Sequence, residues 1–239
     1  MPNPKKPQSS VYRPDLVRLP ALTLGRRIVR RLWKGLVWIV VKIFIRVDLH
    51  GRERLPKHGP MLVVSNHLGD ADAVVGLALS PSLFDVMGKI ELYDIPVLGW
   101  LMDAYGIIWV HRGKPDRRAI RAALDALAED RILAIAPEGR ESKTGGLEEG
   151  THGAAYLALK TNVPVLPVAF TGTENDRVCG NIKRLRRTLV TMTVGQPFYL
   201  QPQDDRRQAL RDGTETIMKS IARLLSPEYR GVYRDVLED

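Results

Sequence analysis

The stretch MLVVSNHLGDAD, residues 61–72, decides the expected fold. Its first five residues form a short apolar run of the kind found in strands buried inside a sheet. The polar residues after Ser65 end this strand, and an apolar pattern at helical spacing begins near Asp70. A buried strand that leads into a helix is typical of α/β proteins, in which ligand sites lie at the carboxyl ends of the strands.

Short apolar runs alternate with helical patterns along the rest of the chain. The predicted strands cover residues 61–65, 84–87, 106–110, 132–136, 165–170 and 188–194. The predicted helices cover about residues 70–79, 152–160 and 209–225, and a further one contains Ile120, Ala123, Leu124 and Leu127. This alternation indicates an α/β fold with a mixed, largely parallel sheet flanked by helices.

The composition excludes several classes of protein. Of the 239 residues, 44% are apolar and 26% are charged, which excludes a disordered, collagenous or coiled-coil chain. The single cysteine, Cys179, excludes an internal disulfide framework and a four-cysteine zinc site. No spacing of His, Cys, Asp and Glu residues resembles a metal site, and no Walker or G-x-G-x-x-G loop is present. We therefore expect neither a metal nor a bound cofactor.

Positive charge is concentrated at the start of the chain. Residues 1–54 contain 13 of the 36 Lys and Arg residues but 3 of the 27 Asp and Glu residues, and the rest of the chain is close to neutral. A basic leading segment indicates an anionic partner, either nucleic acid or the inner leaflet of a membrane.

This leading part divides into two segments ahead of a domain that covers residues 47–239. Residues 1–20 are rich in proline and polar residues, which predicts a poorly ordered arm. Residues 21–46 predict a basic amphipathic helix, because basic and apolar residues fall on opposite faces at 100° per residue. The basic face contains Arg26, Arg27, Arg30, Arg31 and Lys34, and the apolar face contains Leu22, Ile28, Val29, Leu32, Trp33 and Leu36.

The apolar run LVWIVV, residues 36–41, continues this helix but is too short to span a bilayer. Lys42 and Arg46 interrupt the apolar residues after it, so no stretch of about 20 uncharged apolar residues is present. The aromatic residues on or near the apolar face, Trp33, Trp38 and Phe44, favour lipid over nucleic acid. We expect a peripheral protein bound to the anionic, cytoplasmic face of a membrane.

Two histidines have an aspartate five positions later. A carboxylate that binds one imidazole nitrogen lets the other nitrogen take a proton from an alcohol. His67 and Asp72 follow a buried strand at the start of a helix, where α/β proteins place ligand sites, so we expect this pair to be functional. His111 is followed by Asp116, which is better placed to cap the helix after Pro115. Asp70 is interpreted as a helix cap in the same way.

Four blocks of sequence, in order, and one further stretch between the first two resemble a known family. NHLGDAD (residues 66–72) resembles the N-H-x-x-x-x-D signature of the glycerolipid acyltransferases, the 1-acylglycerol-3-phosphate acyltransferase-like family. GIIWVHR (106–112) resembles the family's G-x-x-F-I-x-R, and APEGRES (136–142) resembles its F-P-E-G-T-R-S. VPVLPV (163–168) resembles the proline-containing fourth motif, and GKIELYDIPVLGWLM (88–102) resembles a lysine-containing stretch before the second. The resemblance covers about residues 47–200.

The resemblance implies a role for each matching residue. His67 and Asp72 would be catalytic, and Arg112, Glu138, Gly139, Arg140 and Lys89 would bind substrate. Two departures affect the third motif: Ala136 replaces a phenylalanine, and Arg140 follows Gly139 directly, without the hydroxyl residue between them. In addition, EEGTHG (148–153) replaces a Lys-Gly typical of the family. The catalytic block is therefore intact, whereas the block that reads the acceptor is altered.

The expected activity is transfer of a fatty acyl group to the hydroxyl of a lysophospholipid, with 1-acylglycerol-3-phosphate as the first candidate. The resemblance implies a thioester donor, either acyl carrier protein or coenzyme A. The alternatives are acylation of another hydroxyl lipid, such as a glycolipid, and a non-catalytic basic protein that binds membrane or nucleic acid on the same scaffold. No G-x-S-x-G motif is present, so we expect direct attack by the substrate hydroxyl rather than a covalent enzyme intermediate.

Overall fold

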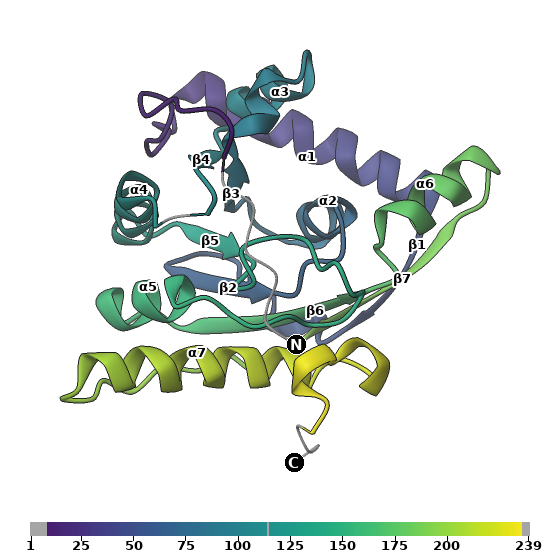
Figure 1. Ribbon diagram of the computed structural model, residues 1–239. Helices are drawn as coiled ribbons and strands as arrows, with labels where there is room; N and C mark the ends of the chain where they lie inside the picture. Colours follow the sequence, from purple (N-terminus) through teal and green to yellow (C-terminus); the bar gives the residue numbers. More distant parts are fainter. Residues whose placement is uncertain (1–8, 114, 236–239) are drawn as a thin grey trace.

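The computed structural model describes residues 9–113 and 115–235, and these residues contain a seven-stranded mixed sheet with helices on both faces (Figure 1). The spatial order of the strands is β1-β7-β6-β2-β5-β3-β4. Neighbouring strands are parallel except for β6 and β7, which are antiparallel. The predicted fold class, a mixed and largely parallel α/β sheet, is confirmed. The strands are β1 (Ile45–His50), β2 (Met61–Ser65), β3 (Asp85–Lys89), β4 (Ile108–Val110), β5 (Ile132–Ile135), β6 (Val165–Thr171) and β7 (Thr188–Val194).

The helices are α1 (Leu24–Phe44), α2 (Ala71–Leu79), α3 (Leu98–Tyr105), α4 (Arg117–Ala128), α5 (Gly153–Thr161), α6 (Asn175–Lys183) and α7 (Arg206–Ala222). Strands β2 and β7 cover the residues predicted from the sequence, and α2, α4, α5 and α7 lie where helical spacing predicted them. Helices α3 and α6 were not predicted. Only Gly99 and Tyr105 of α3 are buried, and no residue of α6 is, so neither has a regular apolar face that sequence spacing could reveal.

The end of the N-terminal helical segment differs from the prediction. The N-terminal helical segment was expected to reach residue 46, but α1 ends at Phe44 and Ile45 begins β1. Residues 45–50 alternate between apolar and polar side chains, which is the period of a strand, and β1 pairs in parallel with β7 along its whole length. The sheet therefore begins within the segment that was expected to be helical.

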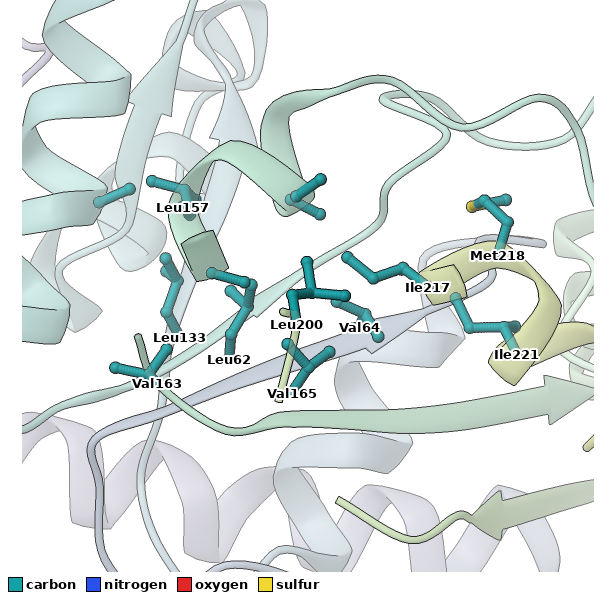
Figure 2. Packing of buried hydrophobic residues seen from close by; sticks show 14 of the residues in the cluster. Leu62, Val64, Leu133, Leu157, Val163, Val165, Leu200, Ile217, Met218 and Ile221 are labelled. Atoms are coloured by element: carbon teal, nitrogen blue, oxygen red, sulfur yellow. The ribbon is translucent and has the colours of Figure 1, made fainter. Parts of the chain in front are cut away.

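Each face of the sheet carries its own apolar core. Helices α4, α5 and α7 cover one face, where Leu62 and Val64 of β2 and Val165 of β6 pack against residues such as Leu157 and Ile217 (Figure 2). Helices α1 and α2 cover the other face, and α3 lies beside α1 (Figure 1). Because the central strands are buried on both faces, the ends of these strands are held firmly.

Helix α1 turns Arg30 and Lys34 of its basic face toward the protein, so only part of this face is free to meet an anionic partner. Arg30 is 3% exposed; its Nη1 lies 2.8 Å from Asp85 Oδ1 and its Nη2 donates to Phe84 O at 2.7 Å. Lys34 Nζ donates to Ser80 O at 2.6 Å. A buried guanidinium requires an opposite charge, and Asp85 at the start of β3 supplies it. Of the five basic residues, Arg27 and Arg31 remain exposed.

The outward side of α1 is apolar. Leu24, Ile28, Leu32, Leu36, Ile39 and Ile43 form an exposed row at spacings of three and four residues, and Leu32 is 69% exposed. The neighbouring segment around α3 adds Ile95, Val97, Leu98 and Trp100, and Trp100 is 71% exposed. We call these ten residues the apolar patch. None of the helices in the described ranges is long and apolar enough to cross a membrane.

The expected N-terminal arm lies partly outside the described residues, which begin at Ser9. Residues 9–20 form no helix or strand, yet Val17 and Pro20 are buried. Ser9 N donates to Arg112 O at 3.0 Å, and Arg13 N donates to His111 Nε2 at 3.0 Å. This part of the arm therefore packs against the segment after β4.

Candidate active site

Five parallel strands, β6, β2, β5, β3 and β4, place their carboxyl ends at one edge of the sheet. The loops after β2, β5 and β4 carry His67, Glu138 and Arg112. Lys89 is the last residue of β3, and Asn175 is the first residue of α6, the helix that follows β6. Residues that are far apart in the sequence thus meet at the edge where α/β proteins bind ligands.

The loop after β2 is fixed by Asn66. Its Nδ2 donates to Phe170 O at 2.8 Å and its Oδ1 accepts from Phe170 N at 2.8 Å, so the side chain bridges to β6 as another strand would. Asn66 is buried, and its amide is satisfied by this pair of bonds. The sequence motif contained Asn66, but the spacing of residues gave no indication of this structural role.

His67 and Asp72 form the predicted pair, because the turn before α2 brings the aspartate back to the ring. His67 Nδ1 lies 2.9 Å from Asp72 Oδ2, and the same oxygen accepts from Leu68 N at 2.8 Å and Gly69 N at 3.2 Å. A side chain at Gly69 would lie 2.5 Å from Thr173 O, so the close turn requires glycine there. Asp70 occupies the N-cap position of α2 but its side chain makes no capping bond, which corrects the predicted cap.

The electrostatics suit a general base. Burial lowers the pKa of His67, but the hydrogen bond and the charge of Asp72, together with the charge of Glu141, outweigh burial and raise that pKa overall. Since Asp72 Oδ2 accepts two backbone N–H groups, the aspartate is held as the acceptor, and His67 Nδ1 is the donor. His67 Nε2 then carries the free lone pair, and it has no hydrogen-bond partner among the described residues.

The loop after β5 holds the backbone of His67 from two sides. Glu138 is 1% exposed; its Oε1 accepts from His67 N at 2.9 Å and its Oε2 accepts from Glu148 N at 2.8 Å. Ser142 N donates to His67 O at 2.7 Å. Burial raises the pKa of Glu138 to about 7. Glu138 was predicted to bind substrate; the structure shows each of its carboxylate oxygens accepting a backbone N–H, an arrangement that can hold the backbone of His67 in position.

Arg140 lies inside this loop, which also differs from its predicted role. It is 4% exposed; its Nε donates to Glu148 Oε2 at 2.8 Å and its Nη2 lies 2.6 Å from the same oxygen. An arginine held by a buried carboxylate is not free to turn toward an acceptor. Gly139, before it, has φ +73°, a left-handed conformation that glycine adopts readily. The charge of the next residue, Glu141, also acts on His67 and raises its pKa.

Arg112 is the predicted binding residue whose charge acts on His67. It is half-buried, and burial lowers its pKa, against the opposing charges of Glu141, Glu91 and Asp70. Its backbone N donates to Ser9 Oγ at 2.8 Å, whereas its guanidinium makes no ion pair within the described residues. Lys89 ends β3, where its Cα is paired with that of Val110 in β4, and its side chain is half-buried.

His111 and Asp116 have nearly the same geometry as His67 and Asp72, but neither ring nitrogen of His111 is free. His111 Nδ1 lies 2.8 Å from Asp116 Oδ2, while Asp116 Oδ1 accepts from Arg118 N and Ala119 N as the N-cap of α4. The second ring nitrogen, Nε2, already accepts the N–H of Arg13. The pair is therefore structural, as its position before α4 predicted.

Three residues that hold the site together were not predicted from the sequence, because they contact residues many positions away in the chain. Glu148 lies in a stretch that departs from the family motif, and no sequence pattern indicates the roles of Asn175 and Glu141. Across the described ranges, no group of three or more His, Cys, Asp and Glu side chains could hold a metal ion.

Comparisons with known proteins agree with this geometry. Residues 46–171, more than half of the chain, match the acyltransferase family. The 1-acyl-sn-glycerol-3-phosphate acyltransferase BAT2, chloroplastic, from Brassica napus is 30% identical over 168 residues, which cover 68% of this chain and 48% of the relative. A lyso-ornithine lipid O-acyltransferase from Pseudomonas aeruginosa is 34% identical over 113 residues, covering 47% of this chain and 43% of the relative. The chain spans about half the length of the curated relatives it matches.

A solved structure has the same fold. The crystal structure of the 1-acyl-sn-glycerophosphate (LPA) acyltransferase, PlsC, from Thermotoga maritima superposes with a TM-score of 0.61 at 22% identity and covers 86% of this chain and 85% of that one. The stretch that matches the acyltransferase family, residues 46–171, begins within β1 and ends with β6. It therefore contains the loops that carry His67, Arg112 and Glu138. The chain, with its His–Asp pair at the carboxyl edge of the sheet, belongs to the acyltransferase family.

Proposed function

We propose that this protein transfers a fatty acyl group from a thioester to the hydroxyl of a lysophospholipid, with 1-acylglycerol-3-phosphate as the first candidate acceptor. The observation that carries the proposal is the 2.9 Å contact between His67 Nδ1 and Asp72 Oδ2, which leaves Nε2 free to take a proton. The names of the relatives support the acceptor, because several are 1-acyl-sn-glycerol-3-phosphate acyltransferases.

The chemistry follows from the orientation of the ring. His67 Nε2 removes the proton of the acceptor hydroxyl as its oxygen attacks the thioester carbonyl, and Asp72 stabilises the imidazolium that forms. The tetrahedral intermediate then expels the carrier's sulfur, which takes the proton from His67 Nε2, leaving an ester and a free thiol. Glu138 and Ser142 act through the backbone of His67, so they keep the ring in place without touching substrate. The donor is acyl carrier protein or coenzyme A.

Product analysis tests this function directly. The full chain is incubated with acyl-carrier-protein and acyl-coenzyme A thioesters and a panel of hydroxyl lipids, and products are identified by mass spectrometry. We expect a new ester on 1-acylglycerol-3-phosphate that is absent with His67→Ala. If no hydroxyl lipid is acylated with either donor, the enzymatic proposal fails and the non-catalytic alternative stands.

A second acceptor class, another hydroxyl lipid, is favoured by the third motif. Arg140 is turned into the protein and Glu141 faces the site, so the loop supplies no free arginine beside His67. The relative from Pseudomonas aeruginosa is named for a lyso-ornithine lipid. The panel therefore includes a lyso-ornithine lipid and a glycolipid.

We further propose that the apolar patch places the enzyme on the cytoplasmic face of an anionic membrane. Exposed apolar areas of this extent on a soluble domain mark an interaction surface, and Arg27 and Arg31 beside the row can attract anionic lipid. Both acyl-bearing lipids are membrane components, so a site that faces a bilayer can take them without extracting them fully into water.

Vesicle co-sedimentation tests this placement. The double variant Leu32→Ser/Ile39→Ser loses two apolar side chains of the patch and should bind vesicles of phosphatidylcholine and phosphatidylglycerol at least about tenfold more weakly. Val232→Ser, an exposed apolar residue near the C-terminal end, is the matched control and should bind as the native protein does. Equal binding by all three proteins, or binding to DNA instead of vesicles, would contradict the proposal.

A further inference from the structure

Glu141 occupies a fixed position beside the catalytic histidine. Its Oε2 accepts from Asn175 Nδ2 at 3.0 Å, and Asn175 Oδ1 in turn accepts from Asp70 N at 2.9 Å. Ser142, the next residue, donates its N–H to His67 O at 2.7 Å. The carboxylate of Glu141 is therefore held between the loop after β5 and the segment that precedes α2, beside His67. Glu141 is half-buried, so part of it remains open to solvent.

The charges around Arg112 are mainly negative. Glu141, Glu91 and Asp70 all lie near enough to oppose the effect of burial on the pKa of Arg112, and Glu141 acts on His67 as well. Arg140, the other arginine of this region, is neutralised by Glu148. An acceptor whose head group carries only negative charge would meet one arginine and several carboxylates, which is a poor match for a phosphate.

We propose that Glu141 binds a cationic group of the acceptor while Arg112 binds its anionic group, so that the site selects a lysolipid with a zwitterionic head. An ammonium donates hydrogen bonds and a carboxylate accepts them, so Glu141 can offer a charge-assisted bond to such a head and only repulsion to a phosphate monoester. This inference rests on the proposed acyl transfer, and it ranks a zwitterionic lysolipid ahead of 1-acylglycerol-3-phosphate as the acceptor.

Four acceptors separate charge from size. 1-Acylglycerol-3-phosphate and lysophosphatidylglycerol carry no cation, whereas lysophosphatidylethanolamine and a lyso-ornithine lipid each carry an ammonium. The glycerol and ethanolamine heads are of similar size, so a preference between those two reports charge. We expect a higher kcat/KM for the acceptors that carry an ammonium.

The variant Glu141→Gln provides the decisive measurement. Glutamine keeps an oxygen for Asn175 Nδ2 and removes only the charge. It should lower kcat/KM for lysophosphatidylethanolamine and lyso-ornithine lipid about 10- to 100-fold, the range expected for a lost hydrogen bond between charged groups. The kcat/KM values for the two acceptors without a cation should stay level or rise. Glu215→Gln, an exposed glutamate of α7, is the control and should change none of the four.

The pH of the assay distinguishes binding of the acceptor by Glu141 from an effect of Glu141 on the pKa of His67. Because the charge of Glu141 raises the pKa of His67, its removal would also shift the pH profile, but equally for every acceptor. The acceptors are therefore compared at a pH where His67 is neutral in both proteins. An equal change for all four acceptors, or none for any, would overturn the inference while leaving acyl transfer established. Absence of transfer to every acceptor would instead remove the proposed function.

Discussion

Two histidines in this chain have nearly the same partner geometry, and the difference between them lies in a single nitrogen. His67 Nε2 has no hydrogen-bond partner among the described residues, whereas His111 Nε2 accepts the N–H of Arg13. A general base needs a free lone pair within reach of the substrate. The second ring is thus kept from catalysis by the N-terminal arm.

This contrast predicts opposite outcomes for two alanine variants. His67→Ala should lower acyl transfer at least about a thousandfold, since general-base catalysis and the orientation of the hydroxyl are both lost. His111→Ala should keep most activity. It should lose some stability because the contacts of the ring with Asp116 and Arg13 are removed, but only some, since Asp116 retains its capping bonds to α4. Single-turnover rates and urea unfolding of both variants provide the check. An active His67→Ala protein would exclude the assigned base.

A pH profile tests the electrostatics of the same site. The neutral form of His67 is the active one, so kcat/KM should fall as pH drops through a pKa above the usual histidine value of 6.5. Asp72→Asn removes the hydrogen bond to a carboxylate and the charge that raise this pKa. The acidic limb of the pH profile of kcat/KM should therefore move to lower pH, and the maximal kcat/KM should fall about a thousandfold or more. Glu138 also titrates near 7. If the limb stays in place in Asp72→Asn, it belongs to Glu138 and not to His67.

At the scale of the element, α1 is oriented by one buried ion pair. The sequence predicts an amphipathic helix, but it does not indicate that Arg30 turns into the protein, because the partner of Arg30 is Asp85, a distant residue on β3. Tyr105 stacks on the Arg30 guanidinium, with its ring centroid 4.6 Å away. These contacts fix the rotation of the helix and thereby expose the apolar patch.

Arg30→Met should therefore destabilise the fold by about 3 kcal/mol, since it leaves the buried Asp85 with Arg131 as its remaining cation. The double variant Arg30→Met/Asp85→Asn should recover part of that loss, because no uncompensated charge remains. Arg31→Met, at an exposed neighbouring position, should change the free energy of unfolding by less than about 0.5 kcal/mol. Chemical denaturation of the three variants measures each difference. Equal losses for Arg30→Met and Arg31→Met would show that the ion pair does not hold the helix.

At the scale of the whole molecule, sequence reasoning succeeded where the signal was local. The apolar runs of β2 and β7 and the spacing between His67 and Asp72 each involve a few neighbouring residues, so pattern alone located them. The polar helix α6 has no buried residue and left no pattern. Side-chain direction in the loop after β5 could not be predicted either, because it depends on Glu148 closing back onto Glu138 and Arg140.

The junction of α1 and β1 has a mechanical consequence. The helix ends at Phe44 and the strand begins at Ile45, so no hinge separates the surface proposed to rest on lipid from the sheet that carries the site. Val41 and Ile45 are buried on either side of the junction, so packing couples the helix to the sheet. On a bilayer, the coupled helix and sheet would hold His67 at one height above the lipid plane. Acceptors would then be selected first by the distance of their hydroxyl from the membrane, because only a hydroxyl at the height of His67 could react. Contacts between side chains and the head group would act after that.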